Sequence, residues 1–308
     1  MRYDVIVIGG SYAGMAAGLQ LIRARRSVLI IDAGERRNRY ASHSHGFLGQ
    51  DGVDPAEIAT NARRQLETYP TLSWLNDRVE AVSGEVDDFT VMTAGGPSHR
   101  SRRILLAVGV VDHLPSVTGL AERWGTSVFH CPYCHGYELG QGRVGIIGAS
   151  PLSIHQAELL TDWGEVTLLV NGALAVSPDA RSALEGRGVT IEEARIDRID
   201  AHADVVMADG RRLHFAGLFT ATRTAPAGAL AEAMGCALEE TPMGVQIRTD
   251  AESKTGVPGV FACGDVARVP HSVSLAVASG AWAGAQLHRS LVWPESLRRA
   301  ERRHGATP

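Results

Sequence analysis

The 308-residue sequence lacks any apolar run long enough for a membrane-spanning helix, which needs about 20 residues. Its first residues, Met1-Arg2-Tyr3-Asp4, lead into a predicted strand and not into the apolar core of a signal peptide. An excess of one charge is also lacking, since 30 Lys and Arg stand against 34 Asp and Glu. We therefore expect a cytoplasmic protein with small or neutral partners, and with neither nucleic acid nor a membrane among them.

Cysteine is scarce, and its four copies are too few for a framework of structural disulfides. Cys131 and Cys134 are separated by two residues, a spacing typical of low-pKa thiolates that cycle between dithiol and disulfide. The alternatives are a zinc half-site and a structural disulfide. Zinc would need a second close ligand pair, but Cys236 and Cys263 stand alone, so we expect no metal. A disulfide that closes so short a loop would stabilise the fold only slightly. His135 follows the pair directly and is a candidate proton donor and acceptor.

The first 32 residues follow the pattern of a dinucleotide-binding βαβ unit. An apolar run over residues 5–8 precedes a glycine turn and a helical pattern, and a second apolar run ends at Asp32. The glycines allow a tight turn, the helix N-terminus faces a diphosphate, and Asp32 can accept hydrogen bonds from a ribose. Ser11 replaces the middle glycine of the motif, which is one defect in the match. A glycine turn in an ordinary α/β domain is the alternative.

A second βαβ pattern begins with the apolar strand predicted over residues 143–147. Its phosphate turn is weaker, because Ser150 and Ser153 occupy glycine positions and Pro151 removes one backbone N–H. No arginine for a 2′-phosphate follows Val170. The pattern predicts a retained fold with a doubtful NADPH site. The alternative is that Pro151 merely begins the helix well and that cofactor contacts come from elsewhere.

The remaining segments add one polar loop and one more apolar strand. Residues 36–52 are too polar and too rich in glycine for a regular element, and loops often carry function. Near the C-terminus, an apolar strand over residues 259–263 meets Gly264 and Asp265. The basic segment from Arg298 to Arg303 is expected to be a solvated terminus.

Three of these features together resemble the low-molecular-weight thioredoxin reductase family of flavoproteins over nearly the whole chain. They are the N-terminal dinucleotide unit, the cysteine pair between two such units, and the segment Cys263-Gly264-Asp265. The resemblance implies an α/β fold of two Rossmann-like, three-layer domains that bind FAD and NAD(P). Residues 1–112 and 245–308 would form the FAD domain, and residues 113–244 an inserted NAD(P)-binding-like domain that carries the cysteines. The usual assembly of the family is a homodimer.

The same resemblance implies roles for individual residues. Cys134 would face the flavin, and Cys131 would exchange with the sulfur of the substrate. Asp265 would hold the ribityl and pyrophosphate region of FAD. The residues implied to contact FAD are Gly9, Ser11, Tyr12, Ala13, Gly14, Asp32, Ala33, His45, Val79, Gly109, Gly264, Asp265, Ser272 and Val273.

Departures from the family pattern resemble its dithiol-oxidase branch. His135 stands where the family has an acidic proton donor, and His271-Ser272-Val273 stands where it has Arg-Gln-Ala. Members of that branch close vicinal thiols of microbial natural products into disulfides, and FAD passes the electrons to oxygen without NADPH. We therefore expect oxidation of a small dithiol with His135 as the base. The alternatives are an NADPH-dependent reductase that acts on a thioredoxin-like protein, a ferredoxin-linked reductase, and a non-enzymatic flavin redox sensor.

Overall fold

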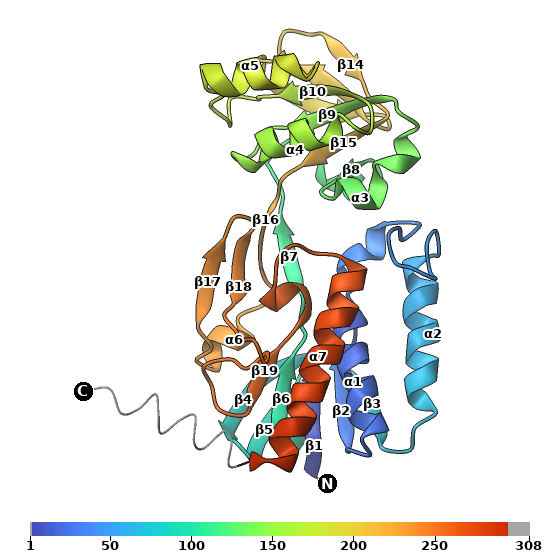
Figure 1. Cartoon of the computed structure of the whole chain (residues 1–308), viewed down its shortest axis with the longest axis vertical. Coiled ribbons are helices and arrows are strands. Elements are labelled where there is room, and N and C mark those ends of the chain that lie inside the picture. The colour runs from blue at the N-terminus through green and yellow to red at the C-terminus, as the bar shows by residue number, and fades with distance from the viewer. Residues whose placement is uncertain (1, 295–308) are drawn as a thin grey trace, which may run out of the picture. The chain divides into compact units, whose positions relative to one another are not determined.

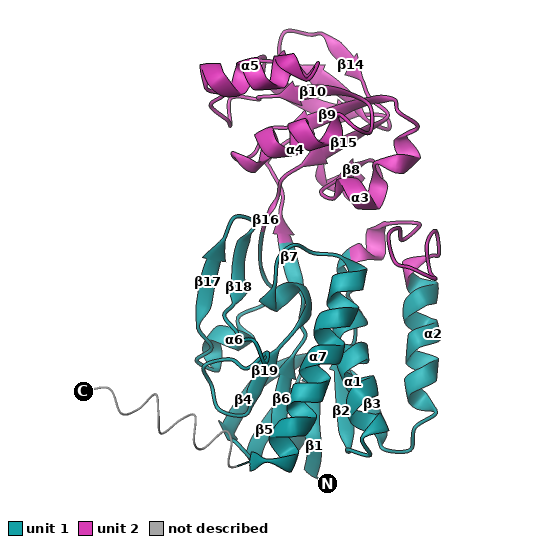
Figure 2. Ribbon diagram, viewed as in Figure 1, with its two compact units in different colours: residues 1–37, 56–111, 224–308 teal, residues 38–55, 112–223 magenta. Residues whose placement is uncertain are grey.

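A computed structural model describes residues 2–294 (Figure 1), so the basic segment from Arg298 to Arg303 lies outside the described residues. The chain divides into two compact units (Figure 2). Unit 1 comprises residues 1–37, 56–111 and 224–308, and unit 2 comprises residues 38–55 and 112–223. The family resemblance implies boundaries after residues 112 and 244, whereas this division places residues 38–55 in unit 2 and residues 224–244 in unit 1.

Unit 1 is built on a seven-stranded sheet in the order β3-β2-β1-β6-β5-β4, with β19 paired to β6. The strands β1, β2, β3, β6 and β19 pair in parallel, whereas β4 and β5 form an antiparallel excursion. The β-branched residues of β1 from Val5 to Val7 are fully buried, as expected for a strand covered on both faces. The strands are β1 (Arg2–Ile8), β2 (Val28–Asp32), β3 (Leu72–Asn76), β4 (Val79–Glu85), β5 (Asp88–Thr93), β6 (Ser98–Leu106) and β19 (Val260–Ala262).

Two helices of unit 1, α1 (Tyr12–Arg23) and α7 (Val273–Val292), pack side by side (Figure 1). Their close approach depends on small residues, because a Cβ at Gly280 would collide with the backbone of Ala13. Ser272 is the N-cap of α7, and its hydroxyl accepts a hydrogen bond from the Leu275 backbone N–H at 3.1 Å. The other helical elements of unit 1 are α2 (Pro55–Glu67), α6 (Leu230–Ala233) and the 3-10 turn η4 (Gly264–Ala267).

Unit 2 contains a five-stranded parallel sheet in the order β11-β10-β9-β15-β8 and a separate antiparallel sheet β12-β13-β14. Its strands are β8 (Val128–Phe129), β9 (Arg143–Ile147), β10 (Glu165–Leu169), β11 (Thr190–Glu192), β12 (Ile196–Asp200), β13 (Asp204–Met207), β14 (Arg212–His214) and β15 (Gly217–Thr220). Its helices are α3 (Pro132–His135), α4 (Leu152–Leu160) and α5 (Pro178–Gly186), with 3-10 turns η2 (Ala121–Arg123) and η3 (Tyr137–Leu139). A further turn, η1 (Arg37–Tyr40), lies where the chain leaves unit 1.

The segment from Leu213 to Thr222 is divided between two strands, β14 and β15. The break has a topological cause, since β14 pairs with β13 in the antiparallel sheet while β15 pairs with β8 and β9. The strands β7 (Val110–His113) and β16 (Arg223–Pro226), where the chain passes between the units, belong to a further sheet with β18 (Gly244–Ile247) and β17 (Leu238–Thr241).

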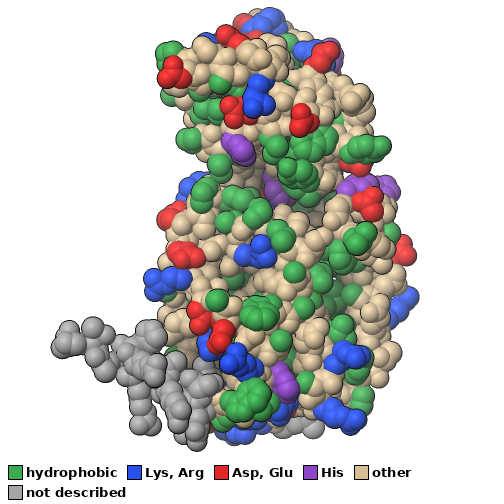
Figure 3. All heavy atoms as spheres, in the orientation of Figure 1, with side chains coloured by type: hydrophobic (Ala, Val, Ile, Leu, Met, Phe, Trp, Pro, Cys, Tyr) green, Lys and Arg blue, Asp and Glu red, His purple; other side chains and the backbone are tan. Residues whose placement is uncertain are grey.

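The surface carries both charges in a mixed arrangement. Figure 3 shows acidic and basic side chains interspersed over the visible face, in keeping with a formal net charge of -4. Within residues 2–294, no helix is long and apolar enough to cross a membrane.

Candidate redox and dinucleotide sites

The two motif cysteines form a disulfide in unit 2, with their Cα atoms 5.3 Å apart. Cys131 is the N-cap of α3, and Pro132 occupies the first helical position, where its missing N–H costs no hydrogen bond. The backbone N–H of Cys134 donates to the Cys131 carbonyl at 3.2 Å, which closes the turn around the two sulfurs. Both cysteines are partly exposed, so an incoming thiol can reach the bond.

His135 ends the same helical turn and lies against an aromatic ring. Its imidazole stacks on Phe129 of β8. Both ring nitrogens are buried, and neither has a hydrogen-bond partner among the described residues. Burial, and to a smaller degree the nearby His45, lowers the pKa of His135 from 6.5 to about 4. The imidazole is therefore neutral near pH 7 and can accept a proton.

The state of the cysteine pair changes the balance at His135. The disulfide is neutral, so it offers no charge that would stabilise an imidazolium next to it. When the bond opens, a cysteine thiolate forms within the same helical turn, and a nearby negative charge favours a protonated imidazole. Reduction of the disulfide therefore increases the affinity of His135 for a proton.

A cavity of about 360 Å³ lies beside His135, wholly within unit 2. Its lining includes Phe129, His135, Glu138 and three further histidines, which are His43, His45 and His202. Neither Cys131 nor Cys134 is among the residues that line this cavity. The cavity therefore opens on the imidazole and not on the sulfur atoms.

His45 lies in this cavity between two carboxylates. Its Nε2 is 3.5 Å from Glu138 Oε1, and its Nδ1 is 3.6 Å from Asp51 Oδ1. The same Asp51 oxygen accepts the Gly46 backbone N–H at 2.8 Å, which fixes the carboxylate within the loop. The prediction placed His45 at the flavin, and its contact with FAD stays a prediction. No motif in the sequence links either carboxylate to His45, although Asp51 lies in the same loop as His45 and Glu138 lies in a distant segment.

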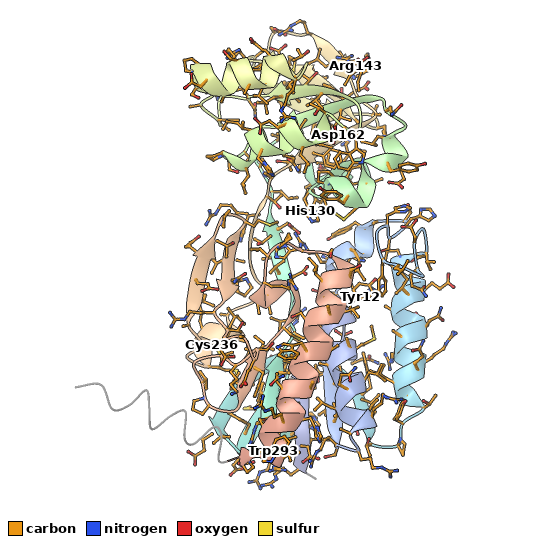
Figure 4. All side chains as sticks on the ribbon, viewed as in Figure 1. Tyr12, His130, Arg143, Asp162, Cys236 and Trp293 are labelled. Carbon is orange, nitrogen blue, oxygen red and sulfur yellow. A yellow bond between two sulfur atoms is a disulfide. The ribbon has the colours of Figure 1, made fainter. Side chains whose placement is uncertain are left out.

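The dinucleotide turn of unit 1 has the shape that a diphosphate requires. Gly9 adopts a φ of +103°, and a Cβ at Gly14 would collide with the carbonyl of Gly9. The Gly10 N–H donates to Asp32 Oδ1 at 2.9 Å, so the predicted ribose ligand stands at the turn. Ser11 is the N-cap of α1 but makes no side-chain capping bond, and the first turn contains no acidic residue. This open, uncharged helix start, where Tyr12 is the first residue (Figure 4), fits the diphosphate of FAD.

The predicted Gly-Asp motif lies in the same unit. Gly264 has a φ of +77°, and its N–H donates to Ser279 Oγ at 3.1 Å. Asp265 pairs with Arg37, with 3.2 Å between Nη1 and Oδ2, a partner that the sequence analysis missed. Of the other predicted FAD ligands, Ala33 follows β2, Val79 begins β4, Gly109 follows β6, and Ser272 and Val273 begin α7. All of these residues belong to unit 1, and their contacts with FAD stay predictions.

The corresponding turn of unit 2 is closed by its own side chain. The backbone N–H groups of Ala149 and Ser150 point to Ser153 Oγ, at 3.1 and 3.4 Å, and Ser153 is fully buried. Pro151, the residue before α4, has no N–H to offer. Two of the N–H groups that would bind a diphosphate are therefore occupied, and a third is absent at Pro151. These residues do not fit the diphosphate of a nicotinamide dinucleotide.

One feature of unit 2 supports the opposite conclusion. The sequence shows no arginine directly after Val170, but the fold brings Arg195 to this loop from the segment between β11 and β12. A Cβ built on Gly172 would lie 3.2 Å from its Nη2. Asn171 is held in place, because its Oδ1 accepts the Ile196 N–H at 2.8 Å. An arginine is thus present where a 2′-phosphate would be bound in a Rossmann unit.

The other two cysteines are unsuited to thiol exchange. Cys236, labelled in Figure 4, and Cys263 are both buried free thiols in unit 1. Burial raises the pKa of Cys263 to about 12, which keeps this thiol protonated. Across residues 2–294, no cluster of three or more His, Cys, Asp or Glu side chains could hold a metal ion.

Comparisons with known proteins extend over both units. Residues 3–280 match the profile of the family described as pyridine nucleotide-disulphide oxidoreductase. The thioredoxin reductase sirT of Leptosphaeria maculans is 32% identical over 303 residues, which cover 92% of each protein. The crystal structure of an oxidoreductase from Agrobacterium tumefaciens is 55% identical, with a TM-score of 0.93, and the similarity covers 96% of this chain and 100% of that one. The structure of HlmI is 35% identical, with a TM-score of 0.88 and coverage of 99% and 98%.

Proposed function

Because the chain belongs to the pyridine nucleotide-disulphide oxidoreductase family, as a thioredoxin reductase-like flavoprotein, we propose that it oxidises a small dithiol to a disulfide and that oxygen is the final electron acceptor. The family and the α/β fold of two Rossmann-like units confirm the resemblance found in the sequence. Membership also implies FAD as the cofactor, and the open turn of unit 1 fits its diphosphate.

The observation that carries this proposal is the closed phosphate turn of unit 2. In a reductase, electrons enter from a nicotinamide dinucleotide bound at such a turn. Here Ser153 already accepts the N–H groups of Ala149 and Ser150, so a bound diphosphate would have to displace a buried hydroxyl. Electrons can instead enter through the Cys131–Cys134 disulfide, which is partly exposed. A dithiol is a suitable electron donor, because it can reduce this disulfide by thiol-disulfide exchange.

The redox step follows from thiol-disulfide exchange. One substrate thiol loses its proton to His135, and the resulting thiolate attacks Cys131 Sγ. The Cys131–Cys134 bond breaks, and its electron pair leaves on Cys134 as a thiolate. The second substrate thiol gives its proton to the Cys134 thiolate and attacks the substrate sulfur bound to Cys131, which closes the product disulfide and releases Cys131 as a thiolate. Two electrons and two protons have then passed from substrate to protein. FAD, held at the turn from Gly9 to Gly14, would supply the acceptor for the two electrons and would link the cysteine pair to oxygen.

Anaerobic mixing tests the direction of electron flow. The FAD-loaded protein is mixed without oxygen either with 1,4-dithiothreitol or with NADPH, and the flavin absorbance is followed. We expect rapid bleaching with the dithiol, slow or no bleaching with NADPH, and one peroxide per dithiol when air is admitted. Rapid bleaching by NADPH, followed by reduction of a thioredoxin, would overturn the proposal.

An NADPH-dependent reductase of a thioredoxin-like protein is the second candidate, and one observation favours it. Arg195 lies at the loop after β10, where a 2′-phosphate would be bound. The relative sirT is also named a thioredoxin reductase. If this candidate is correct, Arg195→Gln should weaken the response to NADPH more than the response to NADH in the same mixing experiment. The dithiol oxidase predicts no difference.

Assembly is the remaining part of the proposal. We propose a homodimer, on the basis of the family resemblance. Light scattering on the FAD-loaded protein should give about twice the chain mass of 32.8 kDa, and a monomeric mass would remove this part without affecting the chemistry.

A further inference from the structure

We propose that the cavity beside His135 is the proton pathway of the redox pair, and that Glu138 is the positioning residue that holds His45 in this cavity as the proton relay. The inference requires that the Cys131–Cys134 pair is redox-active, as in the proposed function. It does not depend on the direction of electron flow, because protons must reach or leave the pair in both directions.

The lining of the cavity indicates its role. Four histidines and one glutamate contribute to its walls, and its volume of about 360 Å³ exceeds the roughly 30 Å³ that one water occupies in the liquid. Water can therefore enter and find several polar partners. Since neither cysteine lines the cavity, a substrate bound there would not meet the sulfur atoms that exchange. A supply of water to the imidazole fits this geometry better than a substrate subsite.

His135 needs such a pathway because its protonated form is unfavourable while the Cys131–Cys134 disulfide is closed. Its ring lies against Phe129, and both nitrogens lack a hydrogen-bond partner among the described residues. Burial makes the imidazolium costly. A proton that His135 takes from a thiol must therefore move on to a group that has carboxylates beside it.

His45 is that group, because two carboxylates face it from different segments. Asp51 belongs to its own loop, and Glu138 belongs to η3, which follows the cysteine motif directly. The other titratable groups that line the cavity are Tyr40, His43, His135 and His202, none of which is a carboxylate. Among the described residues, Glu138 is the carboxylate that follows the cysteine motif and lies at ion-pair distance from His45. Its removal should therefore affect the relay specifically.

The test measures the opening of the disulfide as a function of pH. FAD-loaded Glu138→Gln and wild-type proteins are mixed anaerobically with 1,4-dithiothreitol between pH 5 and pH 9, and flavin bleaching is followed. We expect Glu138→Gln to be about tenfold slower at pH 7. The acid limb of its pH–rate profile should also move, because the substitution removes a carboxylate 3.5 Å from the relay imidazole. Glu122→Gln is the matched control, since Glu122 is exposed in the same unit and does not line the cavity.

The outcomes separate this inference from the proposed function. If wild-type protein is not reduced by any dithiol, the redox proposal itself fails. If wild type is reduced and Glu138→Gln matches it in rate and in pH profile, the relay is wrong. If Glu138→Gln reacts more slowly but the acid limb of its pH–rate profile does not move, Glu138 has a purely structural role, and the relay is also overturned. If Glu138→Gln loses FAD or folds poorly, His45→Gln provides the second test. This variant should abolish the acid limb of the pH–rate profile, because it removes the relay imidazole itself.

Discussion

The imidazole of His135 stacks on the ring of Phe129, with 4.2 Å between the ring centroids and 12° between the planes. Phe129 is itself buried in β8 and also contacts Phe219 of β15. The base of the candidate site is therefore supported by the central sheet of unit 2. This contact links the packing of the core to the protonation of the site.

Replacing Phe129 with leucine should raise the pKa of His135. The smaller side chain removes one face of the stack and admits water, which lowers the cost of the imidazolium. We expect the pKa to rise from about 4 by one unit or more toward the ordinary value of 6.5. NMR titration of ring-labelled histidine measures this directly, with Phe219→Leu as a control that leaves the stacked face intact. An unchanged pKa would show that Phe129 does not control the burial of the imidazole.

His135 should make the fold less stable in mild acid. Its pKa is about 4 in the folded protein and near 6.5 in the unfolded chain, so the unfolded chain binds more protons between these values. The free energy of unfolding therefore falls as pH drops from 6.5 to 4, by about 1–3 kcal/mol. Urea unfolding of wild type and His135→Phe at pH 7 and pH 4.5, with excess FAD, should show a smaller acid loss in the variant. Equal losses would contradict the low pKa.

Replacing either motif cysteine with serine should abolish dithiol turnover while FAD stays bound. The reason is that Cys131 and Cys134 form the exchangeable bond in unit 2, whereas the predicted FAD turn lies in unit 1. Turnover is measured by peroxide release and FAD content by absorbance. Cys236→Ser is the control, because this thiol is buried in unit 1 and is not part of the disulfide. Activity retained in Cys131→Ser would remove the pair from the mechanism.

Ser153→Ala should destabilise the protein by about 1–3 kcal/mol, because it leaves two N–H groups in the turn without their acceptor. Urea unfolding measures the loss. Ser150→Ala is the control, since its hydroxyl makes none of the hydrogen bonds that close the turn, and a change within about 0.5 kcal/mol is expected. A neutral effect of Ser153→Ala would mean that the turn is satisfied in another way, and the case against NADPH would then weaken.

Local features were predictable from the sequence. The turn from Gly9 to Gly14 and its partner Asp32 follow from residue types at fixed spacing, because the tight turn admits few side chains. The pairing of Cys131 with Cys134 is local for the same reason. The strand over residues 143–147 was also correct, since buried parallel strands read as continuous apolar runs.

Contacts between distant segments were not predictable in this way. The approach of Glu138 to His45 and that of Arg195 to Gly172 each join segments that no motif connects. The change of strand between His214 and Gly217 depends on pairing partners in two different sheets. Such features depend on which distant segments pack together in the fold. A residue pattern within one segment does not determine these tertiary contacts.

The division of the chain also has a consequence for the order of synthesis. Unit 2 is complete once residue 223 has been made, because its segments are residues 38–55 and 112–223. The seven-stranded sheet of unit 1 still lacks β19, and α1 still lacks its partner α7, until residue 292 has followed. Because compact units tend to fold as they emerge, the redox disulfide lies in the part of the nascent protein that can be finished first, before the turn for FAD has its full support.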